Sequence, residues 1–302
     1  MPSGSTARID PLAFAGAPVR DWFDATFSEP TPAQARGWPV IAAGTSALIL
    51  APTGSGKTLA AFLAALDRLM FGPAAAAPGT RVLYVSPLKA LGVDVERNLR
   101  APLAGIRNAA ERAGTSFRPP SVGVRSGDTS PAERRRLLRE PPDILITTPE
   151  SLYLMLTSRA EDTLRQVETV IVDEIHTLVA GKRGAHLFLS LERLEALRAS
   201  EAPLQRIGLS ATQRPLEEVA RLLAGYRVPD DATAPLEPRP VEIIDAGSRK
   251  HLELTVEVPV EDMARLGGEE EIPSGPAAGP GTRSIWPSMH PRLLELIRAH
   301  RS

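Results

Sequence analysis

Residues 47–58 read ALILAPTGSGKT, and this stretch decides the fold. Its first five residues are apolar, as in a buried strand, and a helical pattern begins at Leu59. Between the strand and the helix lies a glycine-rich turn that ends in Lys57 and Thr58. A strand, a glycine loop and a helix in this order form the context that a phosphate-binding loop requires.

The loop residues have the properties that phosphate binding needs. Gly54 and Gly56 let the backbone curl so that successive N–H groups point at phosphate oxygens, beside the positive end of a helix dipole. We expect Lys57 to reach the β and γ phosphates and the Thr58 hydroxyl to occupy a Mg²⁺ position. Ala51 replaces the first glycine of the common pattern, and a chance glycine turn is the alternative. The expected nucleotide-binding residues of this loop are Thr53, Gly54, Ser55, Gly56, Lys57 and Thr58.

A pair of carboxylates follows another predicted strand. Residues 170–172 are Val, Ile and Val, and after them come Asp173, Glu174, Ile175 and His176. We expect Asp173 to hold Mg²⁺, usually through water, and Glu174 to act as the base for water attacking the γ-phosphate. A solvated loop for the carboxylates and a surface imidazole for His176 are the alternatives. Zinc binding by His176 and His186 is not expected, because no further ligand has a suitable spacing.

Composition excludes several classes of protein. The 302 residues are 43% hydrophobic, which suggests about two domains of roughly 150 residues. The absence of cysteine excludes disulfides, thiol nucleophiles and cysteine metal sites. A net charge of -1 gives no global attraction to nucleic acid or membranes. Because there is no signal-like N-terminus and the longest apolar run is residues 59–66, we expect a cytoplasmic protein without a membrane partner.

Short apolar runs alternate with helical patterns, which predicts an α/β fold with a parallel sheet. The expected strands are residues 47–51, 82–85, 144–147, 170–172 and 207–209. Leucines at 187, 191, 194 and 197 recur at helical spacing. Ser130 and Glu133 form a capping-box pattern that opens a helix, and Pro141 ends it. Both helices are expected to cover the sheet.

The C-terminal part predicts three regions. Residues 241–244 and 252–258 read as two strands that close the first domain, residues 1–258. Residues 259–289 are rich in Gly, Pro and Glu, as in a flexible linker. Residues 290–302 read as a helix with an apolar face formed by Leu293, Leu294 and Ile297, which we expect to cause self-association. This helix is interpreted as the start of a truncated second domain.

Together these motifs resemble those of superfamily 2 helicases of the DEAD/DEAH-box type. The matching segments are residues 31–34 (Q motif), 51–58 (motif I), 86–91 (motif Ia), 147–152 (motif Ib), 173–176 (the box) and 210–212 (motif III). More narrowly, residues 208–220 and 284–287 look like the large helicase-related (Lhr) proteins. That resemblance implies a P-loop NTPase with a RecA-like sheet, ATP and Mg²⁺ as cofactors, and ATP-driven 3′-to-5′ translocation on single-stranded DNA.

The resemblance also implies roles for individual residues. Lys57, Asp173 and Glu174 are the expected catalytic residues. Gln34 is expected to read the adenine edge through its amide, although Thr31 and Gln34 also form a capping-box pattern. Stacking on adenine is the functional interpretation of Trp22 and Phe27, and a place in the core is the alternative. His176, Ser210 and Thr212 are expected to couple hydrolysis to strand separation.

Nucleic-acid contacts are expected at the edge of the sheet that carries the nucleotide loop. Lysine, threonine hydroxyls and backbone N–H groups there suit phosphate binding without sequence readout, and surface loops are the alternative. The expected residues are Pro87, Lys89, Thr147, Thr148 and Pro149. Residues 125–129 are a further candidate. Arg134, Arg135, Arg136 and Arg139 lie on a helix where Leu137 and Leu138 are expected to face inward, so a solvated basic face is the alternative there.

The family closes two RecA-like lobes around ATP, and the second lobe supplies arginines that stabilise the transferring phosphoryl group. All motifs above belong to the first lobe. We therefore expect a chain that binds ATP·Mg²⁺ weakly and does not unwind alone, with the second lobe supplied in cis or in trans. A DEAD-box RNA helicase is one alternative. The other is a nucleotide-dependent module that binds a nucleic acid or a partner without turnover.

Overall fold

The computed structural model divides the chain into two compact units, residues 1–248 and 249–302. It describes residues 10–73, 77–200, 202–211, 214–229, 233, 235–247, 255–257 and 286–299.

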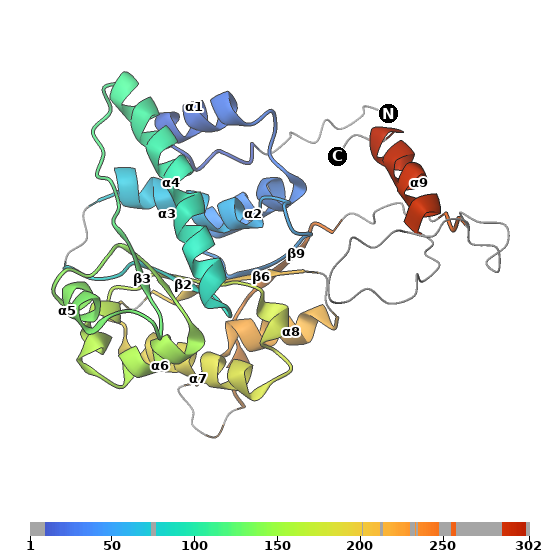
Figure 1. Cartoon of the computed structure of the whole chain (residues 1–302). Coiled ribbons are helices and arrows are strands. Elements are labelled where there is room, and N and C mark those ends of the chain that lie inside the picture. Colours follow the sequence, from blue (N-terminus) through green and yellow to red (C-terminus); the bar gives the residue numbers. More distant parts are fainter. Residues whose placement is uncertain are drawn as a thin grey trace, which may run out of the picture. The chain divides into compact units, whose positions relative to one another are not determined.

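A parallel sheet forms the centre of the first unit (Figure 1). Its order in the described residues is β3-β4-β2-β5-β6-β1-β9, and every neighbouring pair is parallel. The strands are β1 Ala47–Leu50, β2 Val82–Val85, β3 Val122–Arg125, β4 Ile144–Thr147, β5 Thr169–Val172, β6 Gln205–Ser210 and β9 Glu242–Asp245. The five expected strands are confirmed, and β9 closes the sheet at its expected edge. Strand β3 was not predicted, because this half-buried edge strand lacks a continuous apolar run.

Helices cover both faces of the sheet (Figure 1). One layer contains α1 Ala17–Thr26, α2 Pro32–Ala42, α3 Lys57–Phe71 and α4 Lys89–Arg112. The other contains α5 Pro131–Arg139, α6 Pro149–Leu156, α7 Lys182–Leu197 and α8 Leu216–Ala224. Shorter elements are the 3₁₀ helices Arg159–Leu164 and Ile175–Thr177 and the antiparallel pair β7 Tyr226–Arg227 and β8 Glu237–Pro238. The RecA-like α/β architecture is confirmed.

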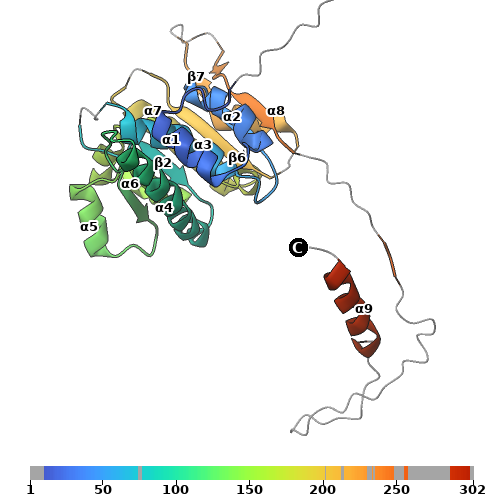
Figure 2. The ribbon, with the colours of Figure 1, turned by 90° about the horizontal axis from the view of Figure 1, so that it is seen from above.

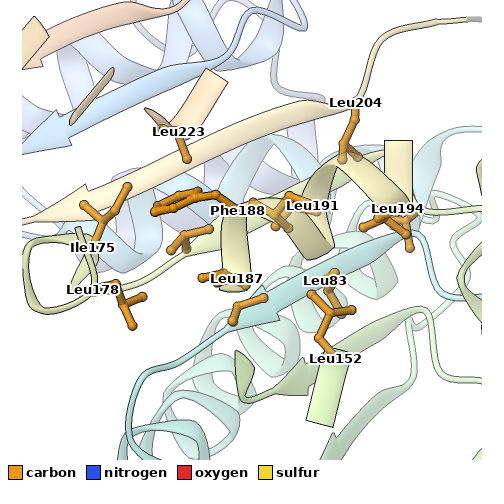
Figure 3. Close-up of a cluster of buried hydrophobic side chains, with 14 of the residues drawn as sticks. Leu83, Leu152, Ile175, Leu178, Leu187, Phe188, Leu191, Leu194, Leu204 and Leu223 are labelled. Carbon is orange, nitrogen blue, oxygen red and sulfur yellow. The ribbon is translucent and has the colours of Figure 1, made fainter. Parts of the chain in front are cut away.

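Alternation along the strands assigns side chains to the two layers. Leu83 and Val85 of β2 join the cluster under α6, α7 and α8, whereas Val82 and Tyr84 join the cluster under α2, α3 and α4. Successive strand residues point to opposite faces, so an unbroken apolar run fills both layers. Figure 3 shows leucines of α7 gathered with Leu83 and Leu152 in the first of these clusters.

The two sequence-predicted covering helices are present. Helix α7 buries Leu187, Leu191 and Leu194, as the leucine spacing predicts. Helix α5 has the expected capping box, in which the Ser130 side chain accepts from Glu133 N and the Glu133 side chain accepts from Ser130 N. The expectation for Leu138 was wrong, because its side chain is exposed and only Leu137 faces inward. On a nine-residue helix at the sheet edge, one buried stripe leaves the adjacent position in solvent.

A third cluster joins α1 to the rest of its layer, and Figure 2 shows α1 lying beside α4. Trp22 and Phe23 of α1 pack with Trp38 of α2 and Ile106 of α4. A Cβ at Gly105 would come within 2.2 Å of the Trp22 ring, so the glycine permits this close approach. The packing therefore holds α1 against α4 and α2.

The second unit is described at residues 255–257 and in α9 Trp286–Ala299, which begins four residues before the expected start. Arg292 donates to both Glu257 and Glu295. Leu293, Leu294 and Ile297 are exposed, as expected of the apolar face. Of the expected strand 252–258, only residues 255–257 are described, and they form no strand; most of the expected linker lies outside the described residues. The domain boundaries stay a prediction. No helix in the described residues is long and apolar enough to cross a membrane.

Candidate functional site

The glycine loop joins β1 to α3 in the conformation that phosphate binding needs. Gly54 and Gly56 have φ angles of 79° and 77°, in the left-handed region that favours glycine. Gly56 is the N-cap of α3, and Lys57 is its first residue. A Cβ at Gly56 would lie 2.5 Å from Nε2 of Gln34, so this position also has no room for a side chain.

Two residues at the start of α2 hold this loop in place. Thr31 Oγ1 donates to the carbonyl oxygen of Ser55 at 2.8 Å, and Gln34 Nε2 donates to that of Gly56 at 3.4 Å. The same side chains form the capping box of α2, with Thr31 N donating to Gln34 Oε1 at 3.0 Å. The capping interpretation is therefore confirmed. The adenine contact of Gln34 stays a prediction.

Lys57 links the phosphate loop to the next strand of the sheet. Its side chain is buried, and its Nζ donates to the carbonyl oxygen of Ser210 at 3.2 Å. The same oxygen accepts from Ala51 N at 3.2 Å. Ser210 is buried at the end of β6, and its hydroxyl has no partner in the described part of the chain. Thr212, which is expected to act with Ser210 in coupling, lies outside the described residues.

The acidic pair lies beside this loop, at the end of β5. The Tyr84 hydroxyl of β2 donates to Oδ2 of Asp173, and Glu174 N donates to Oδ1 at 2.9 Å. Burial, and next the charge of Asp173, hold the pKa of Tyr84 far above its ordinary value, so its hydroxyl stays a neutral donor. Sequence reasoning missed Tyr84, and the signal was a single tyrosine in an otherwise aliphatic strand.

Glu174 has an unusual backbone conformation. Among the described residues it is the one non-glycine residue with a positive φ, 44°. This region costs an L-residue roughly 1–2 kcal/mol, and such conformations cluster at functional sites. The turn places Oε2 of Glu174 3.3 Å from Nδ1 of His176.

His176 connects the acidic pair to β6. Its Nδ1 accepts from Ala211 N at 3.4 Å and lies near the Glu174 carboxylate. An unprotonated Nδ1 can accept from Ala211, whereas a protonated Nδ1 can donate to Glu174, so the two bonds exclude each other. His176 thus contacts the residue that follows Ser210. The role of His176 in coupling hydrolysis to strand separation stays a prediction.

One cavity of about 660 Å³ brings the phosphate loop and the acidic pair together. Its wall includes the phosphate loop, Asp173 and Glu174, and it extends between α1 and α4. Phe27 is 40% exposed and Trp22 is buried in the core, and both line the cavity. Trp22 is therefore a core residue, which was the alternative to adenine stacking. The Phe27 ring is accessible from the cavity.

Oxygen donors suit a magnesium ion here. The Thr58 hydroxyl and the Asp173 carboxylate both lie on this cavity. In the described residues no group of three or more His, Asp or Glu forms a metal cage. Mg²⁺ in nucleotide sites is bound by one or two protein groups together with phosphates and water, so this sparse donor set fits it.

The expected nucleic-acid residues meet at the ends of neighbouring strands. Lys89, Thr147 and Thr148 line one small recess together with residues 125 and 126. Lys89 is exposed and forms an ion pair with Asp128 at 2.7 Å. Thr147 Oγ1 donates to the carbonyl oxygen of Arg125 at 2.8 Å, so this hydroxyl is used internally.

The remaining candidates divide into structural and accessible groups. Thr148 caps α6, its hydroxyl accepting from Ser151 N at 3.4 Å, and Pro149 is the first residue of that helix. Pro87 is buried. Arg134 donates to the carbonyl oxygen of Gly127 at 2.9 Å and so holds the adjacent loop. Arg135, Arg136 and Arg139 of α5 are exposed.

The sequence matches a known family over most of this unit. The model of the DEAD/DEAH box helicase family matches residues 31–220, which contain the phosphate loop and the acidic box. The chain belongs to this family. The resemblance drawn from the motifs is confirmed.

Two curated relatives are Lhr proteins. The chain is 52% identical over 298 residues to an Lhr helicase and probable uracil glycosylase of Mycolicibacterium smegmatis. It is 47% identical over 290 residues to an Lhr helicase/uracil glycosylase of Escherichia coli. These matches cover 99% and 94% of this chain but 18% of each relative. The chain therefore spans less than a fifth of the length of these Lhr relatives.

Solved structures agree with this fold. Mycobacterium smegmatis helicase Lhr bound to ssDNA and AMP-PNP has 52% identity and a TM-score of 0.74, covering 97% of this chain and 34% of that chain. The DEAD-box helicase Mss116 bound to ssRNA and UDP-BeF has 16% identity and a TM-score of 0.62, covering 78% and 44%. At that identity the second match shows the fold alone.

Proposed function

We propose that this chain is the ATP-binding lobe of an Lhr-like helicase that moves 3′-to-5′ along single-stranded DNA. The observation that carries the proposal is the single cavity lined by the phosphate loop, Asp173 and Glu174. The binding of AMP-PNP and ssDNA by the 52% identical relative supports the choice of ligands. Residues 1–258 would form this lobe, 259–289 a linker and 290–302 the start of a second lobe.

The residues of the site have distinct proposed roles. Backbone N–H groups of residues 53–58 bind the phosphates, and Lys57 leaves the Ser210 carbonyl to reach the β and γ phosphates. Thr58 and Asp173 hold Mg²⁺, which neutralises phosphate charge when bound. Glu174 orients the attacking water and accepts its proton. Phe27 lines the cavity, where its ring would stack on adenine. Gln34 lies at the start of α2, and its amide would leave the Gly56 carbonyl oxygen to bind the adenine edge.

The single strand is proposed to bind along the edge that carries Lys89 and the start of α6. Lys89 is exposed there, and the first turn of α6 presents a helix N-terminus, which favours phosphate. Such contacts do not read sequence, as a translocating motor requires. A DEAD-box RNA helicase uses the same chemistry and is the competing proposal.

ATP hydrolysis by this chain tests the proposal. We expect Lys57-dependent nucleotide binding, with weak or no turnover and no unwinding, because arginines of a second lobe are needed for fast phosphoryl transfer. Single-stranded DNA and RNA of matched length are added in parallel arms, and Lys57→Ala is the control. Turnover stimulated by DNA and lost in Lys57→Ala would mean that this lobe suffices. Absence of nucleotide binding in a folded sample would contradict the proposal.

A binding module without turnover is the second candidate. The retained Lys57, Asp173 and Glu174 favour a working half-site over a decayed one. Joining this chain to a second lobe of an Lhr relative distinguishes the two candidates. Turnover in the joined protein favours the helicase, and binding without turnover favours the module.

A further inference from the structure

The fifth residues of α6 and α7 carry a pair of rings at the surface, of which Tyr153 is exposed and His186 is partly buried. Tyr153 of α6 and His186 of α7 have ring centroids 4.5 Å apart at an interplanar angle of 57°. Tyr153 is 39% exposed. The guanidinium carbon of Arg193 lies 5.8 Å from the centroid of the Tyr153 ring. Neither ring has a role in the site described above.

Hydrogen bonds between α6 and α7 flank this ring pair on both sides. On the N-terminal side, Arg183 Nε donates to Glu150 Oε1 at 2.5 Å and Nη2 to Oε2 at 3.1 Å. On the C-terminal side, Arg193 Nη2 donates to the carbonyl oxygen of Leu156 at 3.0 Å. These bonds join α6 to α7 without the rings, so the platform is formed before any ligand arrives. A pre-formed platform loses little side-chain freedom on binding.

The core does not need the Tyr153 ring. Leu152, Met155 and Leu156 of α6 are buried against α7 and the sheet, while Tyr153 and Leu154 face away from that cluster and are exposed. A large aromatic ring with an accessible face is therefore left at the surface. Two aromatic or imidazole rings beside an arginine form the kind of surface on which bases stack.

The position of the rings relates them to the phosphate contacts. Helix α6 begins at Pro149, directly after Thr148 at the strand edge that also carries Lys89. Tyr153 follows Pro149 by four residues, which is about 6 Å of helix rise. In a single strand, a base can lie at about this distance from a phosphate of the same or the adjacent nucleotide. Arg193 places a positive charge beside the Tyr153 ring, whereas the charge of Arg183 is paired with Glu150.

We propose that Tyr153 and His186 form a stacking platform for one base of the single strand whose phosphates bind near Lys89 and the start of α6. The inference rests on the proposed function, because it assumes a nucleic-acid strand on this edge. Every base has a π-face, so such stacking tolerates any sequence. It would hold the strand on this lobe through a base as well as through phosphates.

Binding of fluorescent oligothymidylate and of an abasic oligonucleotide of equal length tests the platform. Tyr153→Ala is expected to weaken binding of the thymidylate about tenfold, whereas Tyr153→Phe retains the affinity. On the abasic strand, Tyr153→Ala and the wild type should bind alike. Leu154→Ala is the matched control, since Leu154 is exposed on the same helix but outside the ring pair. His186→Ala gives a second variant with the same expected pattern.

The outcomes separate three explanations. Equal losses by Tyr153→Ala on both strands would indicate a structural role and overturn the platform. Unchanged DNA affinity, with weaker self-association of Tyr153→Ala and Leu154→Ala in light scattering, would make the patch a protein contact and overturn it as well. A folded wild type that binds ATP but no single strand would contradict both this inference and the proposed nucleic-acid function. A base-dependent loss on RNA and on DNA would support the platform and leave the choice of nucleic acid open.

Discussion

The Nζ atom of Lys57 lies 3.2 Å from the carbonyl oxygen of Ser210, so the first residue of α3 is bonded to the last residue of β6. The oxygen belongs to the segment that also contacts His176 through Ala211. A phosphate that draws Lys57 away removes one of the two N–H donors that this oxygen has. Nucleotide binding is therefore expected to alter the contacts of the strand end that leads to the expected coupling residues.

Lys57→Ala should abolish most of the nucleotide binding while the fold is retained. We expect ATP affinity to fall about 100-fold, because a hydrogen bond from a charged donor to phosphate is lost. The free energy of unfolding should fall by only about 1 kcal/mol, from the lost bond to Ser210. Titration calorimetry and urea unfolding measure the two effects. Lys182→Ala, at an exposed lysine that starts α7, should change neither.

Tyr84→Phe should weaken the magnesium-dependent part of nucleotide binding. The hydroxyl donates to Asp173, and the ring stacks on Phe62 with centroids 5.4 Å apart, a contact that phenylalanine retains. Without this hydroxyl, Oδ2 of Asp173 loses its hydrogen-bond donor, and the Asp173 carboxylate is less firmly oriented. We expect the free energy of unfolding to fall by about 1–2 kcal/mol and the gain in ATP affinity on adding Mg²⁺ to shrink several-fold.

Calorimetry with Mg²⁺ and with EDTA measures that gain. Tyr153→Phe removes an exposed hydroxyl and is the matched control, expected to keep the full Mg²⁺ effect. If Tyr84→Phe shows the same Mg²⁺ dependence as the wild type, the hydroxyl does not orient Asp173 for a metal.

Asp128→Asn should strengthen binding of a single strand. Asp128 pairs with Lys89 at 2.7 Å, and both side chains are more than half exposed, so a phosphate would compete with Asp128 for the lysine. An exposed ion pair contributes up to about 1 kcal/mol, which limits the gain to roughly two- to fivefold. Lys89→Ala should weaken binding and lower the slope of log affinity against log salt concentration by about 1.

Fluorescence anisotropy across a salt series measures both variants. Asp162→Asn is the control, because Asp162 is also exposed and paired, with Arg165. Equal affinities of Asp128→Asn and the wild type at low salt would show that Lys89 does not bind a phosphate.

Sequence reasoning succeeded where the physical cause is local. Five strands are continuous apolar runs, and the capping boxes at Thr31 and Ser130 depend on residues three positions apart. It failed where the cause lies elsewhere in the chain. Strand β3 contains Gly123 and Arg125 and is recognisable only through its pairing with β4. The bond between Tyr84 and Asp173 joins residues 89 positions apart, which no local pattern reveals.

The same distinction applies to the candidate site. The phosphate loop and the acidic box are contiguous in sequence, so their residues could be named in advance. The hydrogen bond from the Thr147 hydroxyl to Arg125 could not be predicted, because it depends on the neighbouring strand, which ends at Arg125. A tertiary contact decides whether a polar side chain at a strand end binds a ligand or the protein itself.

Glu192 should make the fold sensitive to acid. Its Oε1 accepts from Arg206 Nη1 at 2.7 Å and from Arg239 Nη1 at 2.9 Å, and the Arg206 side chain is fully buried. Burial alone would raise the pKa of Glu192, but the bonds from Arg239 and Arg206 together hold it below its ordinary value of 4.5. The charged form is thus favoured in the folded state.

A lowered folded pKa gives stability that is present above the unfolded value and is lost as the pH falls through the folded value. Stability should therefore decline below about pH 4.5. Glu192→Gln should cost about 1 kcal/mol at pH 7, a small value because Glu192 is partly exposed and solvent screens the pair. Near pH 3 the difference from the wild type should shrink, because the wild-type carboxyl is then losing its charge. Urea unfolding at the two pH values measures this, with the exposed Glu217→Gln as the control. A difference that stays constant between the two pH values would mean that the network stabilises through packing and not through the charge of Glu192.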